Sequence, residues 1–136
     1  MSLNAFFKQN AEQIENVEYV VSNRFKNEKG EPEKWILRVL SYDEEKDIKK
    51  ICTRQFTNKG RFDVDFDTEK YILESTTVCV VYPNLNDAEL QDSYGVKSAS
   101  DLLGKMLKPG ELVNLNMKTQ EINGYDSSDK GADIKN

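Results

Sequence analysis

The sequence predicts an α+β fold, in which an N-terminal helix and an antiparallel β-hairpin pack on a cluster of about four C-terminal helices. Two patterns lead to this prediction. Apolar residues recur at every second position within residues 15–40, and at helical spacing in several segments after residue 67. The length of 136 residues suits one domain with its own core. We therefore expect a single domain over residues 1–124 and a disordered polar tail over residues 125–136.

A helix over residues 67–82 is expected at the centre of the fold. Residues 71–83 form the longest weakly charged run of the chain. The Asp67 side chain can accept hydrogen bonds from free N–H groups of the first turn, and Pro83 disfavours helix at the residue before it. Apolar residues lie nearly all around this helix, which predicts burial. A strand over residues 76–81 is the alternative, because that stretch is rich in β-branched residues.

The N-terminal third is predicted to hold one helix and one hairpin. The helix covers residues 2–10 and places three large apolar residues on one side, Leu3, Phe6 and Phe7. These phenylalanines either dock on the core or present an apolar patch to a partner. Alternation in residues 15–25 and 34–40 predicts the two strands of the hairpin, which needs helices or further strands for stability.

The next two segments, residues 42–53 and 55–67, differ in how clearly the sequence indicates their secondary structure. Ser41 and Glu44 fit a capping box, so we expect a helix over residues 42–53. Its inward residues should be Ile48, Ile51 and Cys52. Residues 55–67 fit either a second small hairpin or an extended loop. In that segment a turn signal precedes an alternation of acidic residues with Phe62, Val64 and Phe66.

Three further helices are expected after Pro83. Their starts are marked by a capping box at residues 86–89, by Ser98, and by Pro109 at a first helical position. Gly95 can end the first of them in the left-handed conformation. Residues at helical spacing support the other two helices: the second carries Leu102, Leu103, Met106 and Leu107, and the third has Leu112, Leu115, Thr119 and Ile122 on one side.

The charge of the chain limits its partners. Net charge is −5, and residues 63–92 hold eight acidic residues and one basic residue. Phosphate contacts need clustered Lys and Arg, so nucleic acid is disfavoured. The acidic segment either meets a basic protein or forms a solvated face. No apolar run reaches the roughly 18 residues of a membrane span and no secretory signal is evident, so we expect a cytoplasmic protein without a membrane partner.

Residue types that carry catalysis are scarce in this chain. There is no histidine, and the two cysteines, Cys52 and Cys79, lack metal-ligand spacing and are expected to be reduced, buried thiols. Phosphate-binding glycine motifs are absent from the sequence. The sequence therefore predicts neither an enzyme nor a cofactor.

An incomplete calcium-loop pattern begins at Asp63. Positions 1, 3, 5 and 12 of an EF-hand loop would be Asp63, Asp65, Asp67 and Glu74. However, Thr68 stands where the loop needs glycine for its sharp turn, and Lys70 stands where the loop is normally apolar. We therefore expect a strand with a polar outer face that runs into an Asp-capped helix, and no calcium site.

Several segments together resemble a known family. Residues 80–96 hold Tyr-Pro, Leu-Asn-Asp-Ala-Glu-Leu and Asp-Ser-Tyr-Gly in that order. Leu102-Leu103, Met106-Leu107, Pro109-Gly110-Glu111 and Gln120-Glu121-Ile122-Asn123-Gly124 follow. This order, with the opening residues 2–13 and the strand at residues 18–22, resembles the XkdN-like tail assembly chaperones of PBSX-type prophages and related long-tailed phages. The similarity covers nearly the whole chain up to Tyr125.

The resemblance implies a chaperone that coats the tape-measure protein, a long and largely helical chain that sets tail length. It would keep that chain soluble until tail-tube subunits polymerise around it. The implied partners are the tape-measure protein and then the tail-tube protein, and a minor structural tail protein is the alternative function. A second copy of this chain is a further expected partner, because the apolar surface of the two terminal helices suits it as well as a tape-measure helix. The apolar surplus of the two terminal helices gives the candidate partner-binding residues, Leu3, Phe6, Phe7, Leu112, Val113, Leu115 and Met117.

Overall fold

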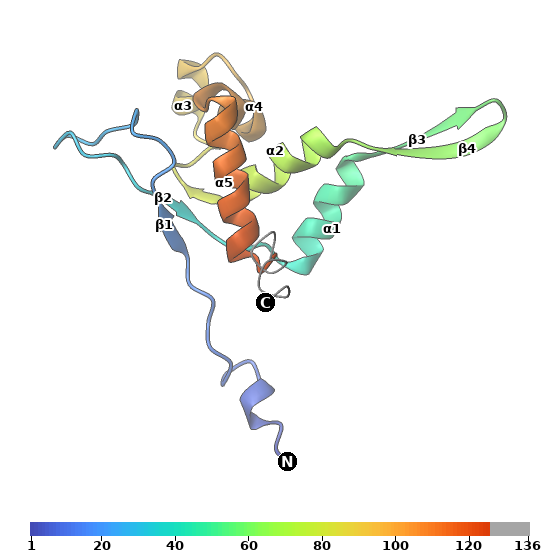
Figure 1. Ribbon diagram of the computed structural model, residues 1–136, viewed down its shortest axis with the longest axis horizontal. Coiled ribbons are helices and arrows are strands. Elements are labelled where there is room, and N and C mark those ends of the chain that lie inside the picture. Colours follow the sequence, from blue (N-terminus) through green and yellow to red (C-terminus); the bar gives the residue numbers. More distant parts are fainter. Residues whose placement is uncertain (126–136) are drawn as a thin grey trace, which may run out of the picture.

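The computed structural model describes residues 1–125, so the tail predicted for residues 125–136 lies outside them apart from Tyr125. The described residues form five α-helices, one 3₁₀ turn and five strands in two small antiparallel sheets. This composition confirms the predicted α+β class. In Figure 1 three parts extend from the helical body: the N-terminal segment, the loop over residues 20–34 and a hairpin over residues 53–66.

A three-stranded sheet forms one side of the body. Its strands are β1 (Val17–Tyr19), β2 (Trp35–Leu37) and β5 (Val80–Tyr82), in the order β1-β2-β5 with antiparallel neighbours. The predicted hairpin is present as β1 and β2, but each strand has three residues and is much shorter than the predicted segments 15–25 and 34–40. Trp35 and Leu37, which alternate with Ile36 along β2, are both buried. The third strand supplies the support that a lone hairpin lacks in water.

Helix α1 (Tyr42–Ile51) begins at the predicted capping box. The Glu44 N–H donates to the Ser41 hydroxyl at 3.1 Å, and the Ser41 N–H donates to the Glu44 carboxylate at 2.9 Å. Both terminal nitrogens of Arg38 also donate to this carboxylate, at 2.9 and 2.6 Å. These hydrogen bonds, led by those from Arg38, lower the pKa of Glu44 to about 2.

The inward face of α1 is narrower than predicted. Ile48 and Cys52 are buried, whereas Ile51 is exposed. A residue four positions on keeps nearly the same direction on a helix, while one three positions on lies about 60° to the other side. Because α1 packs on the body mainly through its contacts with the next helix, only the direction shared by Ile48 and Cys52 is covered.

The central helix ends earlier than predicted. Helix α2 covers Thr68–Cys79, and Asp67 caps it by accepting from the Lys70 N–H at 3.0 Å. Residues 80–82 form strand β5 in place of a last helical turn. Both alternatives from the sequence are thus partly right. The β-branched end of the segment pairs its backbone N–H and C=O groups with β2. A last helical turn could not satisfy these groups, because Pro83 disfavours helix at the residue before it.

The buried side chains of α2 are mostly small and polar rather than large and apolar. The hydroxyls of Ser75, Thr76 and Thr77 each donate to the carbonyl four residues earlier at 2.7 Å. Asn116 Nδ2 on helix α5 (Pro109–Ile122) donates to Thr76 Oγ1 at 2.9 Å. The buried hydroxyls are therefore satisfied within α2, and Thr76 is also bonded to α5.

The three helices predicted after Pro83 are α3 (Ala88–Ser93), α4 (Ala99–Met106) and α5. Asp87 and Ser98 cap the first two, although the capping box expected at residues 86–89 is reduced to Asp87 accepting from the Leu90 N–H. The main core joins these helices to the sheet. It consists of Val21, Trp35, Leu37, Leu85, Leu102, Leu103, Met106, Leu107 and Leu115.

The ambiguous segment after α1 is a hairpin. Strands β3 (Thr53–Asn58) and β4 (Arg61–Phe66) pair antiparallel along their full length. Lys59 and Gly60 form the two-residue turn with φ angles of 51° and 77°. Strand β4 runs into the Asp67-capped α2, as expected in place of a calcium loop. The hairpin projects well beyond the body in Figure 1.

The N-terminal segment differs from its prediction. Only Asn4–Phe6 form a 3₁₀ turn, η1, and residues 1–16 are exposed throughout. The two phenylalanines do not dock on the core, because the segment extends away from the body in Figure 1. A helix this short is marginal in water unless it packs on something, which explains why the helical spacing of its apolar residues does not produce a helix here.

Candidate partner-binding surfaces

The N-terminal arm, residues 1–16, carries the first group of predicted partner-binding residues. Leu3, Phe6 and Phe7 are all exposed, Phe6 by 79%. Residues 2–7 carry no charged side chain. Local hydrogen bonds shape the arm, such as the one from Phe6 N–H to the Leu3 carbonyl at 2.9 Å. The arm thus carries an uncharged, apolar-rich stretch at residues 2–7 away from the body, where a partner can reach it without disturbing the core.

Helix α5 divides the second group of predicted residues. Val113 and Met117, four residues apart on one face, are 55% and 59% exposed. Leu115 is 0% exposed and belongs to the core, and Leu112 is half-buried against that core. Leu115 therefore holds the fold rather than lining a surface. The arm points away from α5 in Figure 1, so the structure does not bring the two groups together.

A cleft of about 350 Å³ lies where α1, α2 and α5 meet. The rings of Phe66 and Tyr71 form one side of it, with centroids 5.6 Å apart. Its other lining residues are Leu40, Glu45, Lys49, Ser75, Cys79, Asn116, Thr119, Gln120, Asn123 and Tyr125. Sequence reasoning missed this cleft, because its residues come from α1, α2, α5 and the segments next to them, whose packing no local pattern specifies.

The charged groups of the cleft pair with one another, and the Asn123 amide bonds to the backbone. The Tyr125 hydroxyl donates to Glu45, which raises the pKa of Tyr125 to about 12 and lowers the pKa of Glu45. Glu45 also pairs with Lys49 at 3.0 Å. The Asn123 amide accepts from the Leu40 N–H and donates to a carbonyl of α5, both at 2.7 Å. These bonds fix the cleft walls and keep its carboxylate ionised.

The residue types that could react or bind a metal occupy structural positions in this fold. Cys52 and Cys79 are free and buried, as predicted, and burial raises the pKa of both thiols, which keeps them protonated at neutral pH. Asp63 and Asp65 lie on β4, and Asp67 is engaged as the N-cap of α2. Within residues 1–125 no three potential metal ligands of the His, Cys, Asp and Glu types come together.

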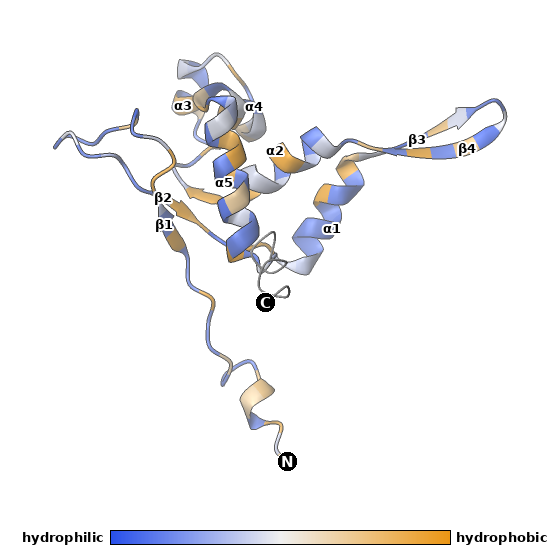
Figure 2. Ribbon diagram, viewed as in Figure 1, coloured by the Kyte–Doolittle hydropathy of each residue, from blue (hydrophilic) through white to orange (hydrophobic). Residues whose placement is uncertain are grey.

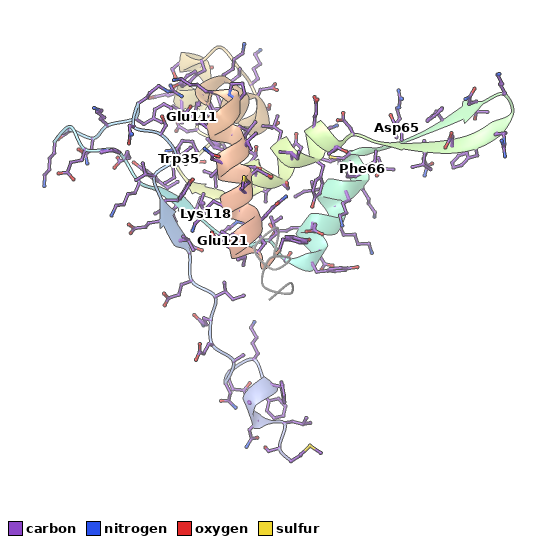
Figure 3. The ribbon with its side chains drawn as sticks, in the orientation of Figure 1. Trp35, Asp65, Phe66, Glu111, Lys118 and Glu121 are labelled. Carbon is purple, nitrogen blue, oxygen red and sulfur yellow. The ribbon has the colours of Figure 1, made fainter. Side chains whose placement is uncertain are left out.

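The hairpin offers a surface that the sequence did not lead us to assign. Phe62, Val64 and Phe66 are all exposed, Phe62 by 71%. Figure 2 shows apolar residues along this projecting hairpin, and Figure 3 places Phe66 at its base next to Asp65. The alternation of these residues with acids was the available signal. The alternation predicted the strand. It could not show that the apolar side of the strand stays uncovered by the other described elements.

The acidic residues of the segment 63–92 do not gather on one surface. Asp63 and Asp65 lie on the hairpin, whereas Asp87, Glu89 and Asp92 lie on or beside α3, on the other side of the molecule in Figure 1. The structure thus favours the simpler interpretation of these acids as solvated groups. Throughout the described residues, helices fall short of the length and apolarity that crossing a bilayer requires.

Comparisons with known proteins agree with the resemblance seen in the sequence. The uncharacterized protein YqbN of Bacillus subtilis strain 168 is 28% identical over 116 residues, which span 84% of this chain and 78% of YqbN. The phage-like element PBSX protein XkdN of the same strain is 25% identical over 116 residues, with the same coverage of both chains. The crystal structure of YqbN aligns over 93% of this chain and 98% of that chain with a TM-score of 0.77 and 24% identity, so the two share a fold.

A family model gives the broadest match. The model described as phage XkdN-like tail assembly chaperone protein, TAC, matches residues 3–135. The match therefore includes the exposed arm, the hairpin and the helical body together. Because it covers nearly the whole sequence, the chain belongs to the XkdN-like phage tail assembly chaperone family.

Proposed function

We propose that this protein acts in the cytoplasm of the bacterial host as a chaperone that binds the tape-measure protein and keeps it soluble during tail assembly. Membership of the family supports a non-catalytic role with protein partners. The observation that carries the proposal is the N-terminal arm, which presents Leu3, Phe6 and Phe7 on an uncharged, exposed segment. An exposed cluster of this kind marks a site for association with an apolar partner.

The arm suits a partner helix with an apolar stripe. Such a helix presents apolar residues at successive turns, and large side chains from an adaptable segment can cover them. Full burial of one phenylalanine contributes about 1.5–3 kcal/mol, so Phe6 and Phe7 together supply a large part of a micromolar affinity. Val113 and Met117 on α5 offer a second apolar spot, where the flexible methionine can adapt to different positions along a long partner.

The test is co-expression of this chain with the tape-measure protein, followed by measurement of soluble tape-measure protein and of co-purification. The double variant Phe6→Ser with Phe7→Ser should lose at least about 100-fold in affinity, because roughly 3 kcal/mol of apolar burial is removed. Its fold should be intact, since the arm does not contribute to the core. The matched control is Tyr42→Ser with Ile51→Ser, which removes two exposed apolar side chains from α1.

The outcomes separate the arm from the function as a whole. Equal binding by the arm variant and the α1 control would show that the arm is not the contact. Failure of the wild-type chain to bind or solubilise the tape-measure protein would refute the proposed function. Recovery of the protein in stoichiometric amounts from purified particles would instead support a minor structural tail protein, since a chaperone leaves the finished tail.

A further inference from the structure

The β3–β4 hairpin has two chemically different faces. Residues paired across the two strands point to the same side, so the register defines each face. One side, here called the uncharged face, consists of Thr53, Gln55, Thr57, Phe62, Val64 and Phe66. The opposite side, called the charged face, consists of Arg54, Phe56, Asn58, Arg61, Asp63 and Asp65.

The charged face satisfies its own groups. Arg54 pairs with Asp65 at 3.2 Å across the strands, and its guanidinium lies 5.3 Å from the centre of the Phe56 ring. Charged side chains are well solvated where they stand. The uncharged face has no such arrangement, because Phe62 and Val64 stand in water with threonine and glutamine side chains beside them, and Phe66 is still 42% exposed despite its contact with Tyr71. Most of the apolar surface that the hairpin can still bury therefore lies on the uncharged face.

In the described structure the hairpin does not lay its uncharged face on the body of its own chain. Strand β3 follows α1 directly and β4 leads directly into α2, and the Asp67 N–H donates to the Cys52 carbonyl at 2.8 Å across the base. Phe66, at the base, already contacts Tyr71 of α2. Phe62 lies next to the turn at the far end, where it is 71% exposed. A cover for this end must come from outside the described body.

We propose that the uncharged face is a self-association surface, on which the same face of a second copy packs about a two-fold axis. A charged partner segment would lose water on this face without gaining a counter-charge, which disfavours it. The uncharged face is complementary to itself in this respect. Two such faces packed about 10 Å apart would form a small β-sandwich with both charged faces outward in water.

Electrostatics favours this location for contact between two copies. Each chain carries a net charge of −5, so most of its surface repels a second copy. The hairpin residues 53–66 carry three basic and two acidic side chains, a net charge of +1. A strand of six residues spans roughly 20 Å, so hairpins packed base to tip hold the two bodies about that far apart. That separation exceeds the Debye length of about 8 Å at physiological salt, and the repulsion is screened.

The surface is small, which sets the expected strength. Two strands of this length present a face of roughly 20 by 10 Å, well below the area of a standard stable interface. We therefore expect a reversible dimer with a dissociation constant of about 10 μM to 1 mM. Such a dimer separates readily on dilution.

The test is sedimentation velocity of the full chain alone, from about 10 μM to 1 mM, with two matched variants. Phe62→Lys places a charge on the uncharged face, whereas Phe56→Lys makes the same change on the charged face, opposite Asp63. Wild type and Phe56→Lys should show the same concentration-dependent dimer. Phe62→Lys should weaken it at least tenfold, even though the added lysine lowers the net charge that opposes association.

Three results would overturn the proposal: a wild-type chain that stays monomeric up to 1 mM, equal association of all three proteins, or loss of the dimer in Phe56→Lys as well. Amide chemical shifts of the wild-type chain give a readout that needs no variant. Their concentration dependence should fall on the uncharged face, and changes confined to the N-terminal arm or α5 would place the contact elsewhere. No tape-measure protein takes part, so the outcome is independent of the proposed function.

Discussion

Leu115 and Met117 lie two residues apart on α5, and replacement of each by alanine should have opposite consequences. Leu115 is 0% exposed and packs in the main core, whereas Met117 is 59% exposed. Leu115→Ala removes three buried carbon atoms and leaves a cavity, which costs about 3 kcal/mol within the usual range of 2.7–5.0. An unfolding entropy of roughly 2.1 cal/mol/K per residue converts this loss to a Tm lower by about 10 °C. Met117→Ala should stay within about 0.5 kcal/mol of wild type.

Urea unfolding followed by circular dichroism measures both effects. The midpoint should shift for Leu115→Ala at an unchanged slope, and remain in place for Met117→Ala. In the co-purification assay the order should reverse, since only Met117 can touch a partner on the folded surface. Equal loss of stability in the two variants would refute the assignment of Leu115 to the core and of Met117 to the surface.

Two further predictions concern pH and calcium. The hydrogen bonds from Arg38 and Ser41 lower the pKa of Glu44 to about 2 from an ordinary 4.5, so the stabilisation they give is complete above pH 4.5 and is lost as the pH falls towards 2. Because this pair is about one-third exposed, solvent screening reduces its contribution to about 1 kcal/mol, and the difference in urea midpoint between wild type and Glu44→Gln should shrink between pH 5 and pH 2. Calcium should not raise the Tm at micromolar concentrations, because Asp63 and Asp65 lie on a strand; a gain at 10 μM calcium would contradict this.

Helix starts were predictable because their signals are local. Ser41, Asp67, Ser98 and Pro109 each stand at or just before the first turn of an observed helix, and the first three accept from a backbone N–H there. A cap depends on groups within four residues of one another, so the sequence contains the whole interaction. The same holds for the two-residue turn at Lys59 and Gly60, where a positive φ is required.

Features that depend on distant partners were not predictable in the same way. Residues 80–82 form a strand because they pair with β2. Their own sequence does not reveal that β2 lies beside them. The N-terminal arm keeps helical spacing but finds no surface in the described structure to pack against. Leu115 shares α5 with the exposed Val113 and Met117, and its position in the periodic pattern was a better guide than its nearness to them.

The distribution of phenylalanine suggests how folding and binding are separated in this chain. Phenylalanine is among the residue types most often buried, yet Phe6, Phe7, Phe62 and Phe66, four of the six in the sequence, are exposed. All four lie on the arm or the hairpin, whereas the core relies on Trp35 and aliphatic residues, and α2 packs through serine, threonine and cysteine. The exposed phenylalanines are thus concentrated where the backbone leaves the body. Changes to them should alter association while the core, which does not use them, keeps its stability.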